Sequence, residues 1–296
     1  MDAPITVVGG TGYIGRRLVE RLVGRGASVR IVSRQARKKG DLAPTIEHVT
    51  GDIEDAVTAG RAVEGASAVV YLVGTTSARS EREFYALHRD APARLAAAAR
   101  RAGARRFLYV SAMGVAPDAP SMADRSKAAG EAAVSEAFPG ANAIRPALVY
   151  GPGDHFFTLF SQLVRSAPAI PLIGGGRTRF QPMHVEDAAE AMARVLEDAR
   201  TAGCAFELGG SEIYSFRELI ERMCAAIGRR PWLVPVPFLL AEAGALATQW
   251  LPNAPLTVDQ VRLLKTDKVI RDPGGAPVVL GVRARGLEDF LAGLSR

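Results

Sequence analysis

The stretch VVGGTGYIG, residues 7–15, predicts how this chain of 296 residues begins to fold. An apolar run leads into three glycines, Gly9, Gly12 and Gly15, in a GxxGxxG spacing. The first glycine permits a tight turn, the second lets the backbone approach a pyrophosphate, and the third lets a helix pack closely against the strand. Free N–H groups at the start of that helix favour a phosphate. We therefore predict a dinucleotide site, with further contacts from Thr11, Tyr13 and Ile14.

Apolar runs alternate with segments of helical period along the first two thirds of the chain. Fully apolar strands separated by helices are typical of a parallel sheet that is covered on both faces. The pattern predicts an α/β fold with a Rossmann-type, doubly wound parallel sheet. The predicted strands lie within 5–10, 27–34, 46–52, 66–74, 105–112, 142–151 and 204–210, and the predicted helices span 13–23, 81–101, 127–137 and 185–196.

The composition changes after residue 151, where short elements are separated by stretches rich in glycine and proline. This change predicts a smaller C-terminal lobe that is interleaved with the first. Residues 1–150, together with about 182–208, are expected to form the dinucleotide-binding domain. Residues 151–181 and 209–296 are expected to form the lobe that holds a substrate or a partner.

The end of the second predicted strand indicates which dinucleotide binds. A carboxylate that holds the ribose normally ends this strand, but here Ser33 and Arg34 stand there with no acid nearby. The guanidinium groups of Arg34 and Arg37 suit a 2′-phosphate. We predict NADP(H), with NAD(H) as the alternative; a solvated basic loop is the purely structural interpretation of the same residues.

Two further strand ends complete the predicted cofactor site. Asp52 and Ile53 follow the third strand, where the adenine ring of a bound dinucleotide would lie. Leu72, Val73 and Gly74 end the fourth strand and would run beneath the second half of the cofactor.

Composition and charge indicate which kinds of ligand and which cellular location to expect. The net charge is +6, but lysine and arginine are scattered, which argues against nucleic acid and favours an acidic cofactor, partner or lipid headgroup. No uncharged apolar stretch reaches the about 18 residues of a membrane span. Cys204 and Cys224 have neither metal-ligand nor CxxC spacing, so we expect no metal site and a reducing, cytoplasmic location without a secretory leader.

The chain carries, in order, GGTGYIG, GD at 51–52, VSA at 110–112, Lys127 and RPALVYGPGD. Together these resemble the extended and atypical short-chain dehydrogenase/reductases. Longer stretches resemble, more narrowly, the nucleotide-binding accessory subunit of respiratory complex I and its bacterial relatives. This resemblance covers nearly the whole chain, and PLTVDQVRLLKTDKV, residues 255–269, is its most specific part.

The wider resemblance implies a lysine and, four residues before it, a tyrosine that exchanges a proton with the substrate as hydride moves to or from nicotinamide. Lys127 matches the lysine, whereas Ala123 stands at the tyrosine position. The usual serine or threonine falls at Ala112 or Met113, and Ser111 is expected to pack beside the cofactor.

Lys127 keeps a use without the tyrosine, because its ammonium can hydrogen-bond the nicotinamide ribose hydroxyls. Pro146 and Ala147 would place backbone groups near the carboxamide, and Tyr150 is a second candidate for a chemical role. A nearly complete cofactor site without its acid favours a bound, structural or sensing nucleotide over turnover.

Three functions follow from this reading. The first is an NADP(H)-binding accessory protein of the complex I subunit type, with a protein partner in the membrane-associated respiratory chain, peripheral to the inner membrane. The second is an active NAD(P)H-dependent reductase or epimerase-like enzyme that acts on a small organic substrate with Lys127 and no tyrosine. The third is a redox sensor that signals by its bound nucleotide.

Overall fold

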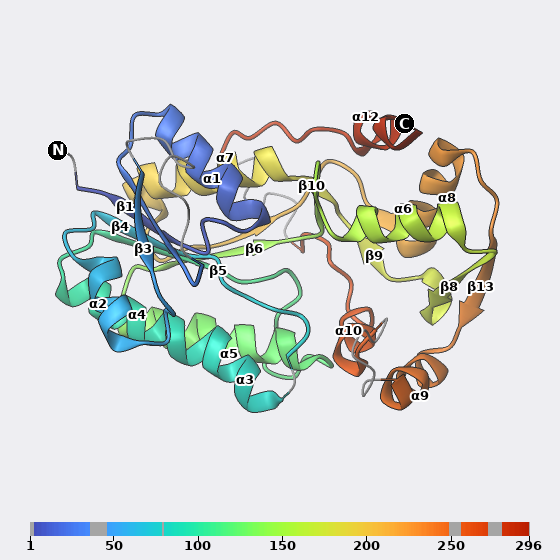
Figure 1. Cartoon of the computed structure of the whole chain (residues 1–296), viewed down its shortest axis with the longest axis horizontal. Helices are drawn as coiled ribbons and strands as arrows, with labels where there is room; N and C mark the ends of the chain where they lie inside the picture. Colours follow the sequence, from blue (N-terminus) through green and yellow to red (C-terminus); the bar gives the residue numbers. More distant parts are fainter. Residues whose placement is uncertain (1–2, 36–45, 79, 249–255, 272–279, 296) are drawn as a thin grey trace.

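A seven-stranded sheet forms the centre of the chain in the computed structural model, which describes residues 3–35, 46–78, 80–248, 256–271 and 280–295 (Figure 1). The strand order is β11–β6–β5–β4–β1–β2–β3, and all neighbours are parallel. The order reverses between β1 and β4, and such sheets bind ligands beyond the carboxyl ends of the strands at the reversal. The predicted doubly wound sheet is confirmed, with strands β1 Ile5–Val8, β2 Val29–Ser33, β3 Ile46–Thr50, β4 Ala68–Tyr71, β5 Arg106–Val110, β6 Asn142–Pro146 and β11 Ala205–Leu208.

Helices cover both faces of this sheet, as Figure 1 shows. Each helical layer packs its apolar side onto the sheet, so the strands are buried from both sides and the chain has two separate apolar clusters here. This is why the strands read as continuous apolar runs in the sequence. One layer contains α1 Tyr13–Gly24 and α7 Val185–Glu197; the other contains α2 Ala56–Val63, α3 Glu81–Tyr85, α4 Ala91–Arg101 and α5 Met122–Ala137.

The helix predicted over 81–101 is not continuous, because a π-helical turn, Ala86–Asp90, separates α3 from α4. Pro92 has no N–H for the carbonyl of His88, four residues earlier. The hydroxyl of Tyr109 on β5 donates to that carbonyl instead, at 2.7 Å. The irregular turn thus keeps its backbone acceptor paired and fixes His88 against the sheet.

Helix α5 begins at Met122, five residues before the start that the sequence predicts. The Ser121 side chain caps it by accepting a hydrogen bond from the N–H of Asp124 at 3.1 Å. Lys127 therefore lies in the second turn of α5, with Ala123 one turn before it.

A smaller lobe follows β7 (Val149–Tyr150), which leaves the main sheet and pairs with β10 (Met183–His184). The single strand predicted over 142–151 is therefore two strands, β6 and β7. An aromatic cluster that includes Tyr150 and Phe157 fills this lobe. Its elements are α6 Phe156–Ser166, β8 Ala169–Ile173, β9 Arg179–Phe180, β12 Tyr214–Ser215, α8 Phe216–Ile227, β13 Trp232–Val236, α9 Phe238–Thr248, α10 Val258–Leu263 and α12 Leu287–Ala292.

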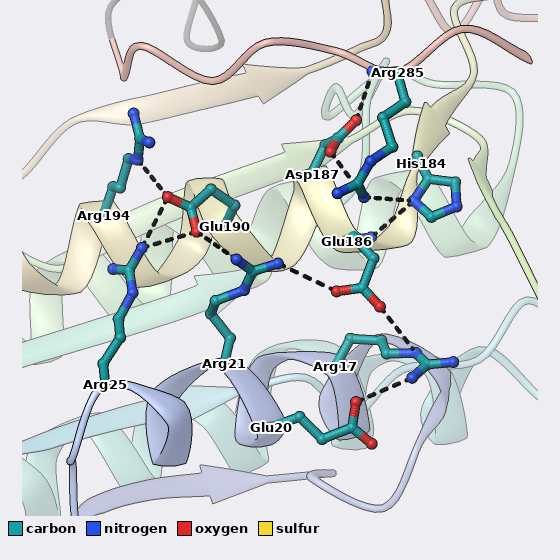
Figure 2. A network of polar contacts seen from close by, with 10 residues as sticks. All are labelled: Arg17, Glu20, Arg21, Arg25, His184, Glu186, Asp187, Glu190, Arg194 and Arg285. Atoms are coloured by element: carbon teal, nitrogen blue, oxygen red, sulfur yellow. Dashed lines mark hydrogen bonds and ion pairs between the residues drawn. The ribbon is translucent and has the colours of Figure 1, made fainter.

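Charged side chains join α1 to α7 along their shared edge (Figure 2). Glu190 of α7 lies 3.1 Å from Arg21 and 2.8 Å from Arg25. Asp187, at the start of α7, pairs with Arg285 of the C-terminal segment at 3.2 Å. A single exposed pair typically contributes only about 0–1 kcal/mol, but the shared carboxylate of Glu190 restricts how α7 can rotate against the helix that follows the glycine loop.

Candidate functional site

The glycine loop lies between β1 and α1 at the carboxyl edge of the sheet. Gly9 has a φ of +85°, which a residue with a side chain rarely adopts. A Cβ at Gly15 would come within 2.2 Å of the Gly9 carbonyl oxygen, so only glycine lets α1 approach β1 here. Gly12, by contrast, is exposed, and its Cβ would meet nothing closer than that same oxygen at 3.2 Å. The exposed backbone at Gly12 and the uncapped start of α1, which has no acid in its first turn, suit a pyrophosphate.

The other residues of the loop lie around this opening. Thr11 and Ile14 are partly exposed. The Tyr13 hydroxyl is buried without a hydrogen-bond partner in the described part of the chain. It lies 3.0 Å from where a Cβ on Gly151 would be, so Tyr13 reaches the segment that leads into the smaller lobe.

Strand β2 ends in polar and basic side chains rather than in an acid. The Ser33 hydroxyl donates to the Gln35 carbonyl at 3.0 Å and lies 2.8 Å from His48 Nε2. Arg34 is exposed beside it and forms no ion pair with any residue that the structure describes. Arg37 lies outside the described residues.

The ends of β3 and β4 are brought to the same edge. Asp52 is exposed, and its carboxylate accepts a backbone N–H two residues further on at 3.0 Å, whereas Ile53 is buried in the core. Leu72 and Val73 pass directly beside the glycine loop, because a Cβ at Gly9 would be 3.3 Å from the Val73 side chain and 3.4 Å from Leu72. Leu72 and Val73 therefore lie beside Gly9 as expected, whereas the cofactor contacts of Asp52 and Ile53 stay predictions.

Lys127 reaches this edge from α5. Its ammonium donates to the carbonyls of Val110 at 3.3 Å and Ser111 at 3.2 Å, at the end of β5. A Cβ at Gly74 would lie 3.2 Å from the same nitrogen. Burial lowers the pKa of Lys127 to about 8, although the nearby Asp124 carboxylate acts to raise it.

Ser111 supplies an unpaired hydroxyl beside this ammonium. The residue is 3% exposed, and its Oγ has no hydrogen-bond partner within the described residues. Buried hydroxyls are normally paired, so this one fits a polar group of a bound molecule. Pro146 and Ala147 lie on the neighbouring segment, where the Pro146 carbonyl accepts from the Met113 N–H at 2.9 Å and the Ala147 N–H donates to Leu208 at 2.8 Å.

The position one turn before Lys127 is closed over by the smaller lobe. Ala123 is only 2% exposed. The carboxylate of Asp259, on α10, accepts the N–H groups of Met122 at 2.5 Å and Ala123 at 3.0 Å. One residue further on, Asp124 binds Lys268 at 2.8 Å. The specific C-terminal stretch of the sequence therefore holds the first turn of α5.

His88 is a member of the site that the sequence analysis did not predict, because the helical period over 81–101 gives no sign of a polar contact there. Its Nε2 accepts the N–H of Thr75 at 3.1 Å, so Nδ1 carries the proton and donates to Ser126 Oγ at 2.7 Å. Burial, and then the charge of Lys127, lower the pKa of His88 to about 3, so the ring is neutral. His88 ties the loop after β4 to α5, and the proline four residues later is the sequence signal that could have indicated an irregular turn.

Tyr150 lies away from this group, in the aromatic core of the smaller lobe. It is fully buried, and its hydroxyl donates to the Arg285 carbonyl at 3.0 Å. Its ring packs against the rings of Phe157, His184 and Phe290. This bond gives the hydroxyl a structural partner, and a chemical role for Tyr150 stays a prediction.

Within the described ranges, no group of three histidine, cysteine or acidic side chains could hold a metal ion. No helix among the described residues is long and apolar enough to cross a bilayer.

Residues 5–209, which include the whole glycine loop and Lys127, match the NAD dependent epimerase/dehydratase family. The chain belongs to this family. It is 32% identical over 285 residues to a mitochondrial NADH dehydrogenase [ubiquinone] 1 alpha subcomplex subunit 9 of Arabidopsis thaliana, an alignment that covers 90% of this chain and 71% of the relative. It is 33% identical over 303 residues to a ceramide reductase of Caulobacter vibrioides, with 96% and 91% covered.

Solved structures share the fold at lower identity. A dTDP-glucose 4,6-dehydratase of Streptomyces venezuelae with NAD bound has a TM-score of 0.76 at 21% identity, over 99% of this chain and 96% of that one. A nucleoside-diphosphate-sugar epimerase of Staphylococcus aureus has a TM-score of 0.79 at 14% identity, over 98% and 99%. The family's dinucleotide fits the open cradle at Gly12 and the unpaired Ser111 hydroxyl described above.

Two glycine substitutions should separate the fold from the site. Gly12→Val is expected to abolish dinucleotide binding in a folded, less stable protein, because the side chain covers the exposed backbone of the loop and its Cβ lies 3.2 Å from the Gly9 carbonyl oxygen. Gly15→Ala is expected to lower the free energy of unfolding by about 1–3 kcal/mol, because its Cβ meets backbone. Gly24→Ala, which has nothing within 4 Å, is the control for both. Urea unfolding and a binding titration give the two readouts; full binding by Gly12→Val would show that the loop is only a turn.

Proposed function

We propose that this chain binds NADP(H) at the carboxyl edge of the main sheet and serves as an accessory or sensing protein of the complex I subunit type. The observation that carries the proposal is the buried Ala123, one turn before Lys127 and closed over by Asp259. The alanine side chain has no proton to give, and its position is buried beneath the smaller lobe. Without that group the site binds and orients a nucleotide but does not complete the proton transfer that a reductase of this family requires.

The residues at the end of β2 favour a dinucleotide whose ribose carries a 2′-phosphate. Arg34 is exposed, has no carboxylate partner in the described part of the chain, and follows Ser33 where an NAD-binding chain would place an acid. A guanidinium can bind a phosphate through two parallel hydrogen bonds. This arrangement supports NADP(H) over NAD(H).

Lys127 is assigned the role of a cofactor clamp. Its ammonium already faces the end of β5, beside Gly74 and the unpaired Ser111 hydroxyl, and it can donate to the hydroxyls of a nicotinamide ribose. When bound, the nicotinamide supplies hydride chemistry. The neutral His88 holds the loop after β4 and α5 together and thereby keeps the ammonium in place.

The relatives support a partner in the respiratory chain. A mitochondrial subunit of NADH dehydrogenase matches 90% of this chain. We place the protein on the cytoplasmic side, in contact with a membrane-associated protein partner. The nucleotide would then act as a structural element or as a redox signal of that assembly.

A second candidate is an NAD(P)H-dependent reductase or epimerase-like enzyme that uses Lys127 without a tyrosine. The observation that favours it is the lysine pKa of about 8, close to neutral pH, beside the buried Ser111 hydroxyl. Such a lysine can donate a proton near physiological pH. The similarity to a ceramide reductase makes a lipid ketone the substrate class to examine first.

Substitution of Arg34 tests the choice of dinucleotide. The parent protein is expected to bind NADPH about tenfold to a hundredfold more tightly than NADH, because a charge-assisted bond to phosphate typically contributes about 1.5–3 kcal/mol. Arg34→Ala should remove this preference and leave NADH affinity unchanged, and Arg101→Ala, an exposed arginine at the end of α4, should change neither. Equal affinities for the two cofactors in the parent, measured by fluorescence titration, would contradict the assignment.

The pH dependence of binding tests the clamp. NADPH affinity should fall as the pH rises through about 8, because the free protein then loses the charged ammonium that the nucleotide favours. The expected loss is up to about tenfold for each unit by which the nucleotide raises the lysine pKa. Lys127→Met should bind more weakly and with a flat profile from neutral to alkaline pH. A profile that is the same in both proteins would assign the titration to another group.

The deciding experiment is NADPH consumption by the parent protein with a panel of ketones, quinones, enones and lipid ketones. We expect no substrate-dependent oxidation, since a missing general acid typically costs about 10²–10⁴-fold in rate. Rapid oxidation that disappears in Lys127→Met would replace the accessory function with a lysine-dependent reductase. Rapid oxidation that survives in Lys127→Met would remove both assignments of the lysine.

A further inference from the structure

Helix α9 is apolar on its inner and on its outer side. Phe238, Ala241 and Ala245 face inward and pack with Ile173 and Val261 of the smaller lobe. The outer side carries exposed apolar side chains only: Leu239, Leu240, Ala243, Leu246 and Ala247. Helices of soluble proteins normally place polar residues on their outer face, so an apolar outer face indicates a surface that is covered in use.

The preceding strand extends this surface. Trp232 and Val234 of β13 are exposed and lie opposite Ala169 and Pro171 of β8, which are exposed as well. Residues paired in register share one face of a sheet, so the outer face of this two-stranded sheet is apolar. Trp232 is 79% exposed, Leu239 80% and Leu240 63%, and we call this set, with Val234 and Leu246, the apolar end.

The apolar end lies at one extreme of the molecule. Figure 1 shows β13 and α9 at the end of the long axis opposite the N-terminus and the outer strands of the main sheet. Phe238 anchors α9 there, because its ring fills the space where a Cβ on Gly174 would be. The surface is therefore part of the fold and is presented away from the dinucleotide site.

Basic side chains flank the apolar end, and the acids near it are Glu242, Glu221 beside the two arginines that precede it, and Asp267 in the hollow next to α9. Arg229 and Arg230 directly precede it and are exposed, and no ion pair to either is found among the described residues. Glu242 is the sole acid between residues 229 and 248, and it pairs with Lys265 at 2.5 Å. Next to the helix, Arg177 lines a hollow of about 550 Å³ together with Lys265 and Phe238.

We propose that the apolar end docks on an anionic lipid bilayer. Leucines and a tryptophan would enter the boundary between headgroups and acyl chains, and the arginines would bind lipid phosphates. At 1.5 Å per residue, the 11-residue α9 is about 16 Å long and lies in the interface rather than across the membrane. An anionic bilayer is favoured because the exposed apolar side chains are preceded by Arg229 and Arg230, two exposed arginines that form no ion pair with any described residue and suit lipid phosphates.

Vesicle flotation of the full chain tests this proposal. Vesicles of equal parts phosphatidylcholine and phosphatidylglycerol should carry the protein, and vesicles of phosphatidylcholine alone should carry much less. The double variant Leu239→Asp and Leu240→Asp should lower the partition coefficient at least about a hundredfold, because burial of each leucine is worth about tenfold or more in affinity. Val57→Asp, at a valine on α2 that is 70% exposed, is the matched control and should partition as the parent does.

Three results would overturn the proposal. They are no partition into anionic vesicles, the same partition in the double variant as in the parent, and an equal loss in the Val57→Asp control. Self-association of the parent that the double variant abolishes, without vesicle binding, would assign the apolar end to a second copy instead. An NADPH titration of each variant checks the fold and keeps this proposal separate from the proposed function, since neither result depends on the other.

Discussion

Helix α1 can follow strand β1 at its observed distance only because position 15 has no side chain. A single methyl group there would stand 2.2 Å from the Gly9 carbonyl oxygen. That close approach points the start of α1 at the crevice between β1 and β4, where the strand order reverses. The cradle at Gly12, the passage of Leu72 and Val73 beside the loop, and the alignment of α1 with α7 all depend on this contact.

The second constraint is the way the smaller lobe holds the first turn of α5. Asp259 accepts two N–H groups of that turn, and Lys268 pairs with the buried Asp124. Removing one partner of a buried ion pair is costly, because the other charge is then left unpaired. The lobe therefore does more than cover the sheet edge, since it fixes the turn from which Lys127 extends and it closes the space around Ala123.

Periodicity in the sequence was sufficient for the strands of the main sheet, because strands buried on both faces leave continuous apolar runs, and for most of its helices, although it did not predict α2. It failed where tertiary contacts replaced local ones. The π-helical turn depends on Tyr109, a distant residue that binds the His88 carbonyl left free by Pro92. Likewise the first turn of α5, which begins at Met122, is held by the distant Asp259, and the split of β6 from β7 follows pairing with β10.

The sequence alone determined the glycine loop, the absence of an acid after β2, and the presence of lysine and alanine at positions 127 and 123, because these depend on residue identity and spacing. Only the tertiary structure decided that Ser111 has an unpaired hydroxyl, that His88 is neutral beside Lys127, and that Tyr150 is engaged by Arg285. It also decided that an apolar helix keeps its outer face exposed. The physical reason is that burial, hydrogen-bond partners and pKa values depend on tertiary contacts between segments that are distant in the sequence. Local sequence patterns do not predict those contacts.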